Sequence, residues 1–181
     1  NLLLPEVDFH VGKKQLKDIL QHVINTHGTT RTAEVLDDIK AMGYKYSTRA
    51  AMTVSISEMT VPPVKKQLIA DAEKKVEQIN INYNRGRSTD EERYKNVIRV
   101  WQETDKTLLD ALLSGLDKYN NIFMMADSGA RGSMSQIRQL AGMRGLIANT
   151  SGKTIEIPIR ANYREGLNIL EYFISSRGAR K

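Results

Sequence analysis

The sequence predicts a mainly α-helical protein, built around an antiparallel helical hairpin with smaller helical subdomains and a few short strands. Apolar residues recur at helical spacing through most of the chain, and two such stretches flank the polar turn at residues 83–87. Hydrophobic residues make up 40% and charged residues 27% of the 181 positions, as in an ordinary globular protein. Because the chain has no cysteine, disulfides and thiolate metal sites are excluded.

The net charge of +6 lies mostly in the last third, where residues 121–181 hold nine basic and four acidic side chains. A local basic surface fits nucleic acid or nucleotide phosphates, although a solvated basic face explains the charge equally well. No apolar run is long enough to span a membrane and no leader opens the chain, so we expect no membrane partner and a cytoplasmic location. Both ends of the sequence look truncated, so we expect the chain to be a fragment of a longer protein.

Residues 1–60 are predicted to be helical with one short strand. Residues 1–11 are extended, and a helix follows from Gly12 to Gly28. A second helix begins near Thr30 and ends before Gly43, its buried stripe formed by Ala33, Leu36 and Ile39. Residues 44–52 are ambiguous, and the alternation at residues 53–59 predicts the strand. His10, His22 and His27 raise the question of a metal site. His22 and His27 do not share a helix face, however, and no carboxylate completes a set of ligands, so we predict no metal site.

Residues 61–120 are predicted to form the hairpin and a connector. Pro62 and Pro63 start its first helix, whose apolar stripe comprises Val64, Leu68, Ala72, Val76 and Ile79. Ser88 with Glu91 matches a capping box for the returning helix, which buries Tyr94, Val97, Ile98, Trp101, Leu108 and Leu112. The hairpin is either a structural strut or a docking post for a partner; the sequence alone favours the strut.

Residues 124–148 organise the rest of the chain. A loop of small residues, 127–132, precedes a short helix that we start at Ser133, with Gln136 at capping-box spacing and Gly142 as its stop. The apolar face of this helix comprises Met134, Ile137, Leu140 and Ala141. Arg131 and Arg138 flank its capped end, a plausible cradle for a polyphosphate. The pattern of a P-loop is absent, so the chemistry alone favours a tight turn with solvated arginines.

The remaining residues are predicted to form a turn, a strand pair and a final helix. The turn falls at residues 149–153 and the strand pair at residues 154–159. From Tyr163 onward the helical face consists of Leu167, Leu170, Phe173 and Ile174.

The string ADSGARGS at residues 126–133, continued by QIRQLAGMRGL, resembles the segment of the bacterial RNA polymerase β′ subunit that precedes its bridge helix. The string ANYREGLNILEYFISSRGARK at residues 161–181 resembles the approach to that helix. The resemblance covers the whole chain. It implies three parts: the end of the pore region and the start of the funnel (residues 1–60), the rim-helix hairpin of the funnel with a connector (61–120), and the wall of the secondary channel and active site with the start of the bridge helix (121–181).

The resemblance also implies roles for single residues. Arg131 and Arg138 match arginines that meet the triphosphate of the entering nucleotide, with Met125 and Gln139 as further candidates for the channel wall. At the hairpin tip, Arg85 and Arg87 are candidates for contacting regulators that insert a coiled coil into the channel, such as transcript-cleavage factors. Gly178 is a candidate hinge of the bridge helix.

The family polymerises nucleoside triphosphates on DNA with two magnesium ions, held by an aspartate motif, NADFDGD, that these residues lack. We therefore expect no catalytic residue, metal or cofactor in this fragment, and no catalysis by it alone. The implied partners are the β, α, ω and sigma subunits, template DNA and RNA.

Two alternatives to a polymerase part are a stand-alone hairpin module that docks a coiled-coil regulator, and a nucleotide-binding protein that uses residues 129–138.

Overall fold

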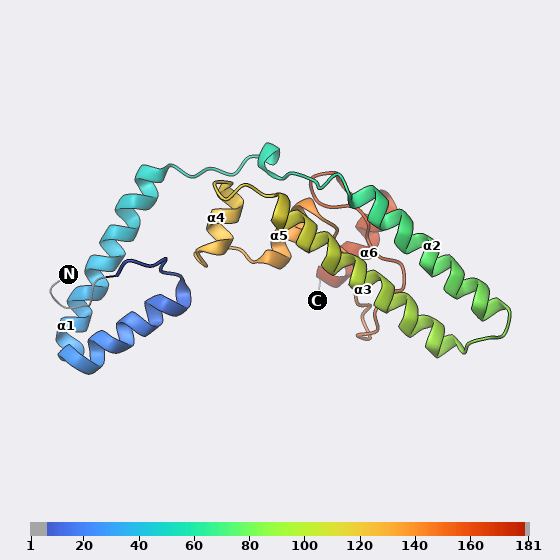
Figure 1. Ribbon diagram of the computed structural model, residues 1–181, viewed down its shortest axis with the longest axis horizontal. Helices are drawn as coiled ribbons and strands as arrows, with labels where there is room; N and C mark the ends of the chain where they lie inside the picture. The colour runs from blue at the N-terminus through green and yellow to red at the C-terminus, as the bar shows by residue number, and fades with distance from the viewer. Residues whose placement is uncertain (1–6, 180–181) are drawn as a thin grey trace. The chain divides into compact units, whose positions relative to one another are not determined.

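The computed structural model describes residues 7–179. Within that range the chain forms six α-helices and one 3-10 helix, without a sheet, so the predicted mainly α class is confirmed (Figure 1). The described residues divide into two compact units. The first unit comprises residues 7–55 and 118–133, and the second comprises residues 56–117 and 134–179.

In the first unit, helix α1 (Lys13–Ala50) bends at Gly28, whose φ of 75° and ψ of 178° are not helical. The predicted break at Gly28 is therefore confirmed, since glycine adopts a positive φ without steric cost. Val23 and Thr32 are buried, and the Thr32 hydroxyl donates a hydrogen bond of 2.7 Å to the carbonyl of Gly28. The predicted end before Gly43 is wrong, because the helix continues to Ala50; a single glycine lowers helix stability by only about 1 kcal/mol.

The predicted strand at residues 53–59 is wrong, since this stretch holds the 3-10 helix η1 (Ile56–Glu58). Val54 and Ile56 are 54% and 70% exposed, so their alternation does not mark a half-buried face. Helix α4 (Asn121–Asp127) escaped prediction from the sequence. Its start is fixed by Asn120, whose side-chain oxygen accepts from the backbone N–H groups of Ile122 (3.0 Å) and Phe123 (3.2 Å).

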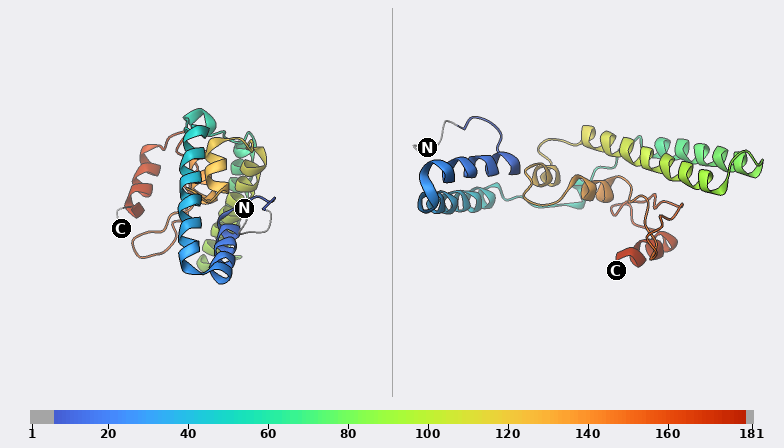
Figure 2. Two further views of the ribbon diagram at one scale, coloured as in Figure 1. Left: turned by 90° about the vertical axis from the view of Figure 1, so that its left-hand side faces the viewer. Right: turned by 90° about the horizontal axis from the view of Figure 1, so that it is seen from below.

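The second unit contains the predicted hairpin, α2 (Lys65–Asn84) and α3 (Asp90–Gly115), which lie side by side in Figure 1 and in the right-hand view of Figure 2. Its hydrophobic core combines residues of both helices with one residue from beyond α5: Ala72, Val97, Trp101, Leu108 and Met143. Of the predicted buried face of α3, Val97, Trp101, Leu108 and Leu112 are buried, while Tyr94 and Ile98 are half-buried.

Two predicted details of the hairpin are wrong by one residue. Val64 precedes α2 and is 48% exposed, whereas Lys65, the first helical residue, is buried. The capping box of α3 uses Thr89 and Glu92 instead of Ser88 and Glu91. Glu92 N–H donates to Thr89 Oγ1 (3.3 Å), and Thr89 N–H donates to Glu92 Oε2 (3.0 Å), because the helix begins at Asp90.

Helix α5 (Met134–Ala141) begins one residue after the predicted start and buries Ile137 and Ala141. Met134 and Leu140 are half-buried. Gly142 directly follows the helix, as predicted, and a Cβ at this position would lie 2.8 Å from the carbonyl oxygen of Arg138, too close for a side chain.

The predicted turn at residues 149–153 is confirmed by a hydrogen bond of 2.8 Å from Asn149 N–H to the carbonyl of Lys153. The predicted strand pair is reduced to two antiparallel bridges, Gly145 with Ile159 and Ala148 with Thr154. Helix α6 (Ile169–Ala179) begins six residues after Tyr163, and its predicted face is largely exposed, at 75% for Leu170 and 65% for Phe173. The predicted hinge at Gly178 lies outside the residues whose surroundings the structure describes, and it stays a prediction.

Candidate functional site

In the first unit, the loop at residues 127–132 presents Arg131 to solvent. Gly129 and Gly132 on either side of it have φ values of 73° and 86°, a left-handed backbone that favours glycine. The Arg131 N–H donates to the carbonyl of Met125 (3.3 Å), which fixes the loop against α4. Among the described residues no carboxylate pairs with the Arg131 guanidinium, so its N–H donors face solvent.

In the second unit, Arg138 of α5 forms an ion pair with Asp105 of α3, from Nη1 to Oδ2. The two side chains are 25% and 18% exposed. Burial raises the pKa of Asp105 above its ordinary value, while the Arg138 guanidinium acts in the opposite direction. Because a guanidinium has five N–H donors, the single bond to Asp105 does not use up its capacity.

Arg131 and Arg138 therefore have different surroundings. They belong to different units. Of the two predicted wall residues, Met125 lies in the same unit as Arg131, and Gln139 lies in the same unit as Arg138. The first arginine is held by the backbone of its loop and the second by a half-buried ion pair.

Two stretches of the chain match domains of one known family. Residues 69–164 match RNA polymerase Rpb1, domain 4, and residues 8–59 match RNA polymerase Rpb1, domain 3. The chain belongs to the RNA polymerase Rpb1 family. All four arginines that were predicted as site residues fall within the range of the domain 4 match: Arg85, Arg87, Arg131 and Arg138.

Relatives of this Rpb1-family chain are similar along its whole length. The DNA-directed RNA polymerase subunit beta′ of Lachnoclostridium phytofermentans is 70% identical over 181 residues, all of this chain and 14% of the relative. The subunits of the same name from Clostridium acetobutylicum and Caldicellulosiruptor saccharolyticus are 59% and 58% identical, again over all of this chain. The chain spans 14% to 16% of the length of these three relatives.

Gln139 lies in a polar cluster that the sequence did not predict. Its side-chain oxygen accepts from Arg144 Nη1 (3.0 Å), and the Arg144 guanidinium lies over the ring of Tyr163, 5.1 Å from the centroid, while Nη1 also contacts the Tyr163 hydroxyl. Burial lowers the pKa of Arg144 from its ordinary value. The Gln139 side chain is therefore held by a hydrogen bond within the second unit. Its place on a channel wall stays a prediction.

The predicted regulator contacts, Arg85 and Arg87, lie in the turn between α2 and α3 and are exposed. Gly86 between them has a φ of 69°, and the backbone N–H groups of Arg85 and Arg87 donate to carbonyls at the end of α2. The structure thus places both at the hairpin tip; contact with a regulator stays a prediction.

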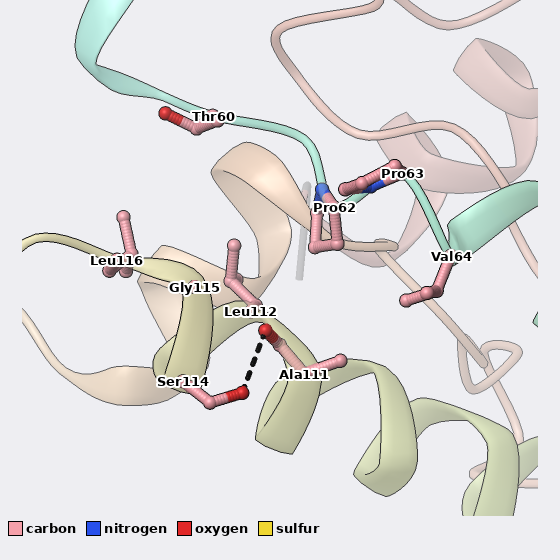
Figure 3. Close-up of a pocket in the computed structure, with 9 residues that line it drawn as sticks. All are labelled: Thr60, Pro62, Pro63, Val64, Ala111, Leu112, Ser114, Gly115 and Leu116. Carbon is pink, nitrogen blue, oxygen red and sulfur yellow. Dashed lines mark hydrogen bonds between the residues drawn. The ribbon is translucent and has the colours of Figure 1, made fainter.

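An apolar hollow of about 320 Å³ lies where the chain enters α2 and leaves α3. Figure 3 shows Pro62, Leu112 and Leu116 around it, and the Ser114 hydroxyl bonded to the carbonyl of Ala111 (3.1 Å). Because no charged side chain lines this hollow, it supplies no groups for phosphate binding or acid–base chemistry.

Two charged side chains of the second unit, the half-buried Asp105 and the buried Lys65, were missed, although the sequence holds a signal for both. Asp105 follows Trp101 by four residues and precedes Leu108 by three, so it occupies a position of the apolar stripe of α3. Lys65 precedes Leu68 by three residues in the stripe of α2, and its ammonium pairs with Glu165. A charged residue at a stripe position predicts a buried ion pair, because a buried charge requires a partner.

The described residues contain no group of three or more His, Cys, Asp or Glu side chains placed to share a metal ion. The expected lack of a metal in this fragment stays a prediction. None of the helices in the described part is both long enough and apolar enough to cross a bilayer.

Proposed function

We propose that this chain is a part of the β′ subunit of a bacterial, cytoplasmic DNA-directed RNA polymerase, the nucleotidyltransferase that makes RNA from nucleoside triphosphates on a DNA template. The observation that carries the proposal is the 70% identity to a subunit of that name over the entire chain. The comparisons give no support to a stand-alone hairpin module.

Within that enzyme, the three parts would be the end of the pore region (residues 1–60), the funnel (61–120) and the wall of the secondary channel with the start of the bridge helix (121–181). The partners would be the other polymerase subunits (β, α, ω and sigma), template DNA, RNA and regulators that enter the channel. Arg85 and Arg87 would meet such regulators, because they are exposed cations at the tip of a rigid hairpin.

The chemical role of this part is to bind the triphosphate of the entering nucleotide. Arg131 offers an exposed guanidinium without a carboxylate partner among the described residues, and Arg138 offers the donors that Asp105 leaves unused. Charge-assisted hydrogen bonds from guanidinium to phosphate neutralise charge and orient the leaving pyrophosphate. Met125 in the first unit and Gln139 in the second unit are further candidates for the channel wall, as the resemblance implies. Metal-dependent catalysis belongs to residues outside this chain, so the fragment alone would not catalyse the reaction.

The proposal is tested by Arg131→Ala and Arg138→Ala in the complete polymerase, measuring single-nucleotide addition over a range of nucleoside triphosphate concentrations. A lost hydrogen bond to a charged group is equivalent to about a tenfold to hundredfold loss in kcat/KM, and we expect this loss chiefly at low substrate. Arg99→Ala is the matched control, because Arg99 is an exposed α3 arginine whose side chain is 72% accessible. Unchanged addition kinetics in both test variants would refute the proposal.

A further inference from the structure

The end of helix α5 poses a hydrogen-bonding problem, because the last four carbonyls of any α-helix lack partners within the helix. In α5 the carbonyl of Arg138 is satisfied at 2.7 Å by the N–H of Gly142. The carbonyls of residues 139–142 remain to be satisfied. Gln139 and Leu140 are half-buried, and Ala141, Gly142 and Met143 are buried, so protein groups are needed to satisfy these carbonyls.

A segment about 20 residues further along the chain satisfies all four carbonyls. The backbone N–H of Tyr163 donates to the carbonyl of Gln139 (3.1 Å), and that of Arg164 donates to the carbonyl of Leu140 (3.2 Å). The side-chain amide of Asn162 donates to the carbonyls of Ala141 and Gly142, both at 3.0 Å. Residues 162–164 therefore form a tertiary C-terminal cap for α5.

Every polar atom of the Asn162 side chain makes a hydrogen bond in this cap. It is 0% exposed, and its two amide hydrogens are used by two different carbonyls. Its side-chain oxygen accepts from the N–H of Glu165 (2.8 Å), which holds the cap segment in its turn. An aspartate would fit the same space but would replace two donors with an oxygen that faces two carbonyl oxygens.

The far side of the cap is fastened to the start of the hairpin. Glu165 pairs with the buried ammonium of Lys65, the first residue of α2, and the Arg164 guanidinium donates to the carbonyl of Met59. The short connection from residue 165 to α6 follows directly. The segment thus joins three elements of the second unit: the start of α2, the end of α5 and the approach to α6.

We infer that Asn162 is a positioning residue for nucleotide binding: it holds α5, and with it the Arg138 guanidinium, in register with the approach to α6. The inference rests on the proposed function, since it takes Arg138 to contact the triphosphate. Asn162 is fully buried and its side-chain hydrogen bonds all go to backbone groups, so it acts through α5 and not on the substrate.

The test is a double-mutant cycle in the complete polymerase with Asn162→Asp and Arg138→Ala, measuring KM and kcat for single-nucleotide addition. We expect Asn162→Asp to raise the KM for the nucleoside triphosphate about tenfold, the equivalent of one to two lost hydrogen bonds, with the same division between KM and kcat as Arg138→Ala. In the Arg138→Ala background, Asn162→Asp should add less than a further twofold change.

Asn149→Asp is the matched control, because the Asn149 side chain uses its oxygen, accepting from the N–H groups of Ser151 (2.9 Å) and Lys153 (3.0 Å). The same chemical change there should leave the KM unaltered. If Asn162→Asp does not assemble, Asn162→Ala removes the amide without adding charge and enters the same cycle.

A second measurement does not depend on any variant. In the wild-type polymerase the amides of Tyr163 and Arg164 should exchange with solvent as slowly as the amides inside α5, and rapid exchange would overturn the cap. Additive effects of the two substitutions, or an unchanged KM in Asn162→Asp, would overturn the positioning role alone. If Arg138→Ala itself leaves the KM unchanged, the proposed function of Arg138 is wrong and the positioning role falls with it.

Discussion

The two compact units of this chain differ in how much apolar surface they bury. The second unit encloses a cluster of large side chains from α2, α3 and the segment after α5, with Trp101, Leu108 and Met143 each at most 3% exposed. The first unit, within residues 7–55 and 118–133, buries one apolar side chain, Val23. The second arm of α1 instead leaves large apolar side chains exposed: Leu36, Met42, Tyr44 and Tyr46.

This difference explains how each unit holds its arginine. Since most helical stability comes from packing of an apolar face, the first unit has little packing with which to fix a side chain. It positions Arg131 through backbone geometry, between Gly129 and Gly132. The second unit fixes Arg138 through side chains, namely Asp105 and the capped end of α5. Substitutions in the two units should therefore differ in their effects on stability.

The largest effect is expected from Trp101→Ala. Truncating a fully buried tryptophan removes its apolar contacts and leaves a cavity, so the free energy of unfolding should fall by about 3–5 kcal/mol. Urea denaturation of the chain, followed by far-UV circular dichroism, measures this change. Leu170→Ala is the control, since Leu170 is 75% exposed, and it should change the free energy by less than about 0.5 kcal/mol. Equal effects of the two would mean that the hairpin core contributes little.

A smaller effect on the free energy of unfolding is expected from substituting Arg138, and a smaller one still from substituting Arg131. Arg138→Ala leaves the half-buried carboxylate of Asp105 without its partner and should lower the free energy of unfolding by about 2 kcal/mol, whereas Arg131→Ala should cost less than about 0.5 kcal/mol. Asp105→Asn combined with Arg138→Ala should recover part of the loss, because an amide is less costly to bury than an unpaired charge. Similar losses for the two single variants in urea denaturation would contradict the comparison.

The next effect is the loss of folding stability at low pH. Glu156 accepts two hydrogen bonds from Arg93 of α3, at 2.6 and 3.0 Å, and this pairing lowers the pKa of Glu156 below its ordinary 4.5. A depressed carboxyl pKa stabilises the fold above the unfolded value, and the contribution disappears as the pH falls through the folded value. We expect wild type to lose about 1–2 kcal/mol more than Glu156→Gln when the pH falls from 7 to below the folded pKa.

The control for this acid effect is Glu103→Gln, because Glu103 meets Arg99 only at 3.8 Å on the surface of α3. Wild type and this variant should show the same pH dependence in urea denaturation. If Glu156→Gln also retains the full dependence, the ion pair with Arg93 does not hold residues 149–157 against the hairpin.

The sequence predicted best where one physical signal acted alone. The hairpin and its turn followed from apolar periodicity around a polar loop, and the bend at Gly28 followed from the one residue that accepts a positive φ. The strand at residues 53–59 was wrong because alternation requires a neighbouring strand, which no local pattern reveals. The end at Gly43 was wrong because glycine is tolerated inside a helix at modest cost.

The candidate site was less predictable than the fold, because its contacts join residues that are far apart in the sequence. Local chemistry marked Arg131 and Arg138 as a candidate polyphosphate cradle, and the resemblance supplied their expected role. Nothing in their spacing indicates that one is paired and the other is not. Asn162 is an ordinary polar residue in the sequence, and its part in capping α5 depends on chain folding that brings together positions about 20 residues apart. Asp105 and Lys65 did carry a local signal, because each occupies a position of an apolar helix stripe.

The smallest effect compares the starts of the long helices. The N-cap residue of α1 is Gly12, which supplies no side-chain cap, whereas α3 begins with the reciprocal pair of Thr89 and Glu92. Thr89→Ala should lower the free energy of unfolding by about 1 kcal/mol, because it leaves a backbone N–H of the first turn without its partner. Ser88→Ala should have almost no effect, since the buried Ser88 hydroxyl makes no hydrogen bond in the described chain. Urea denaturation of both variants decides between them: a larger loss for Ser88→Ala would restore the capping box that sequence spacing first indicated and move the start of α3 back by one residue.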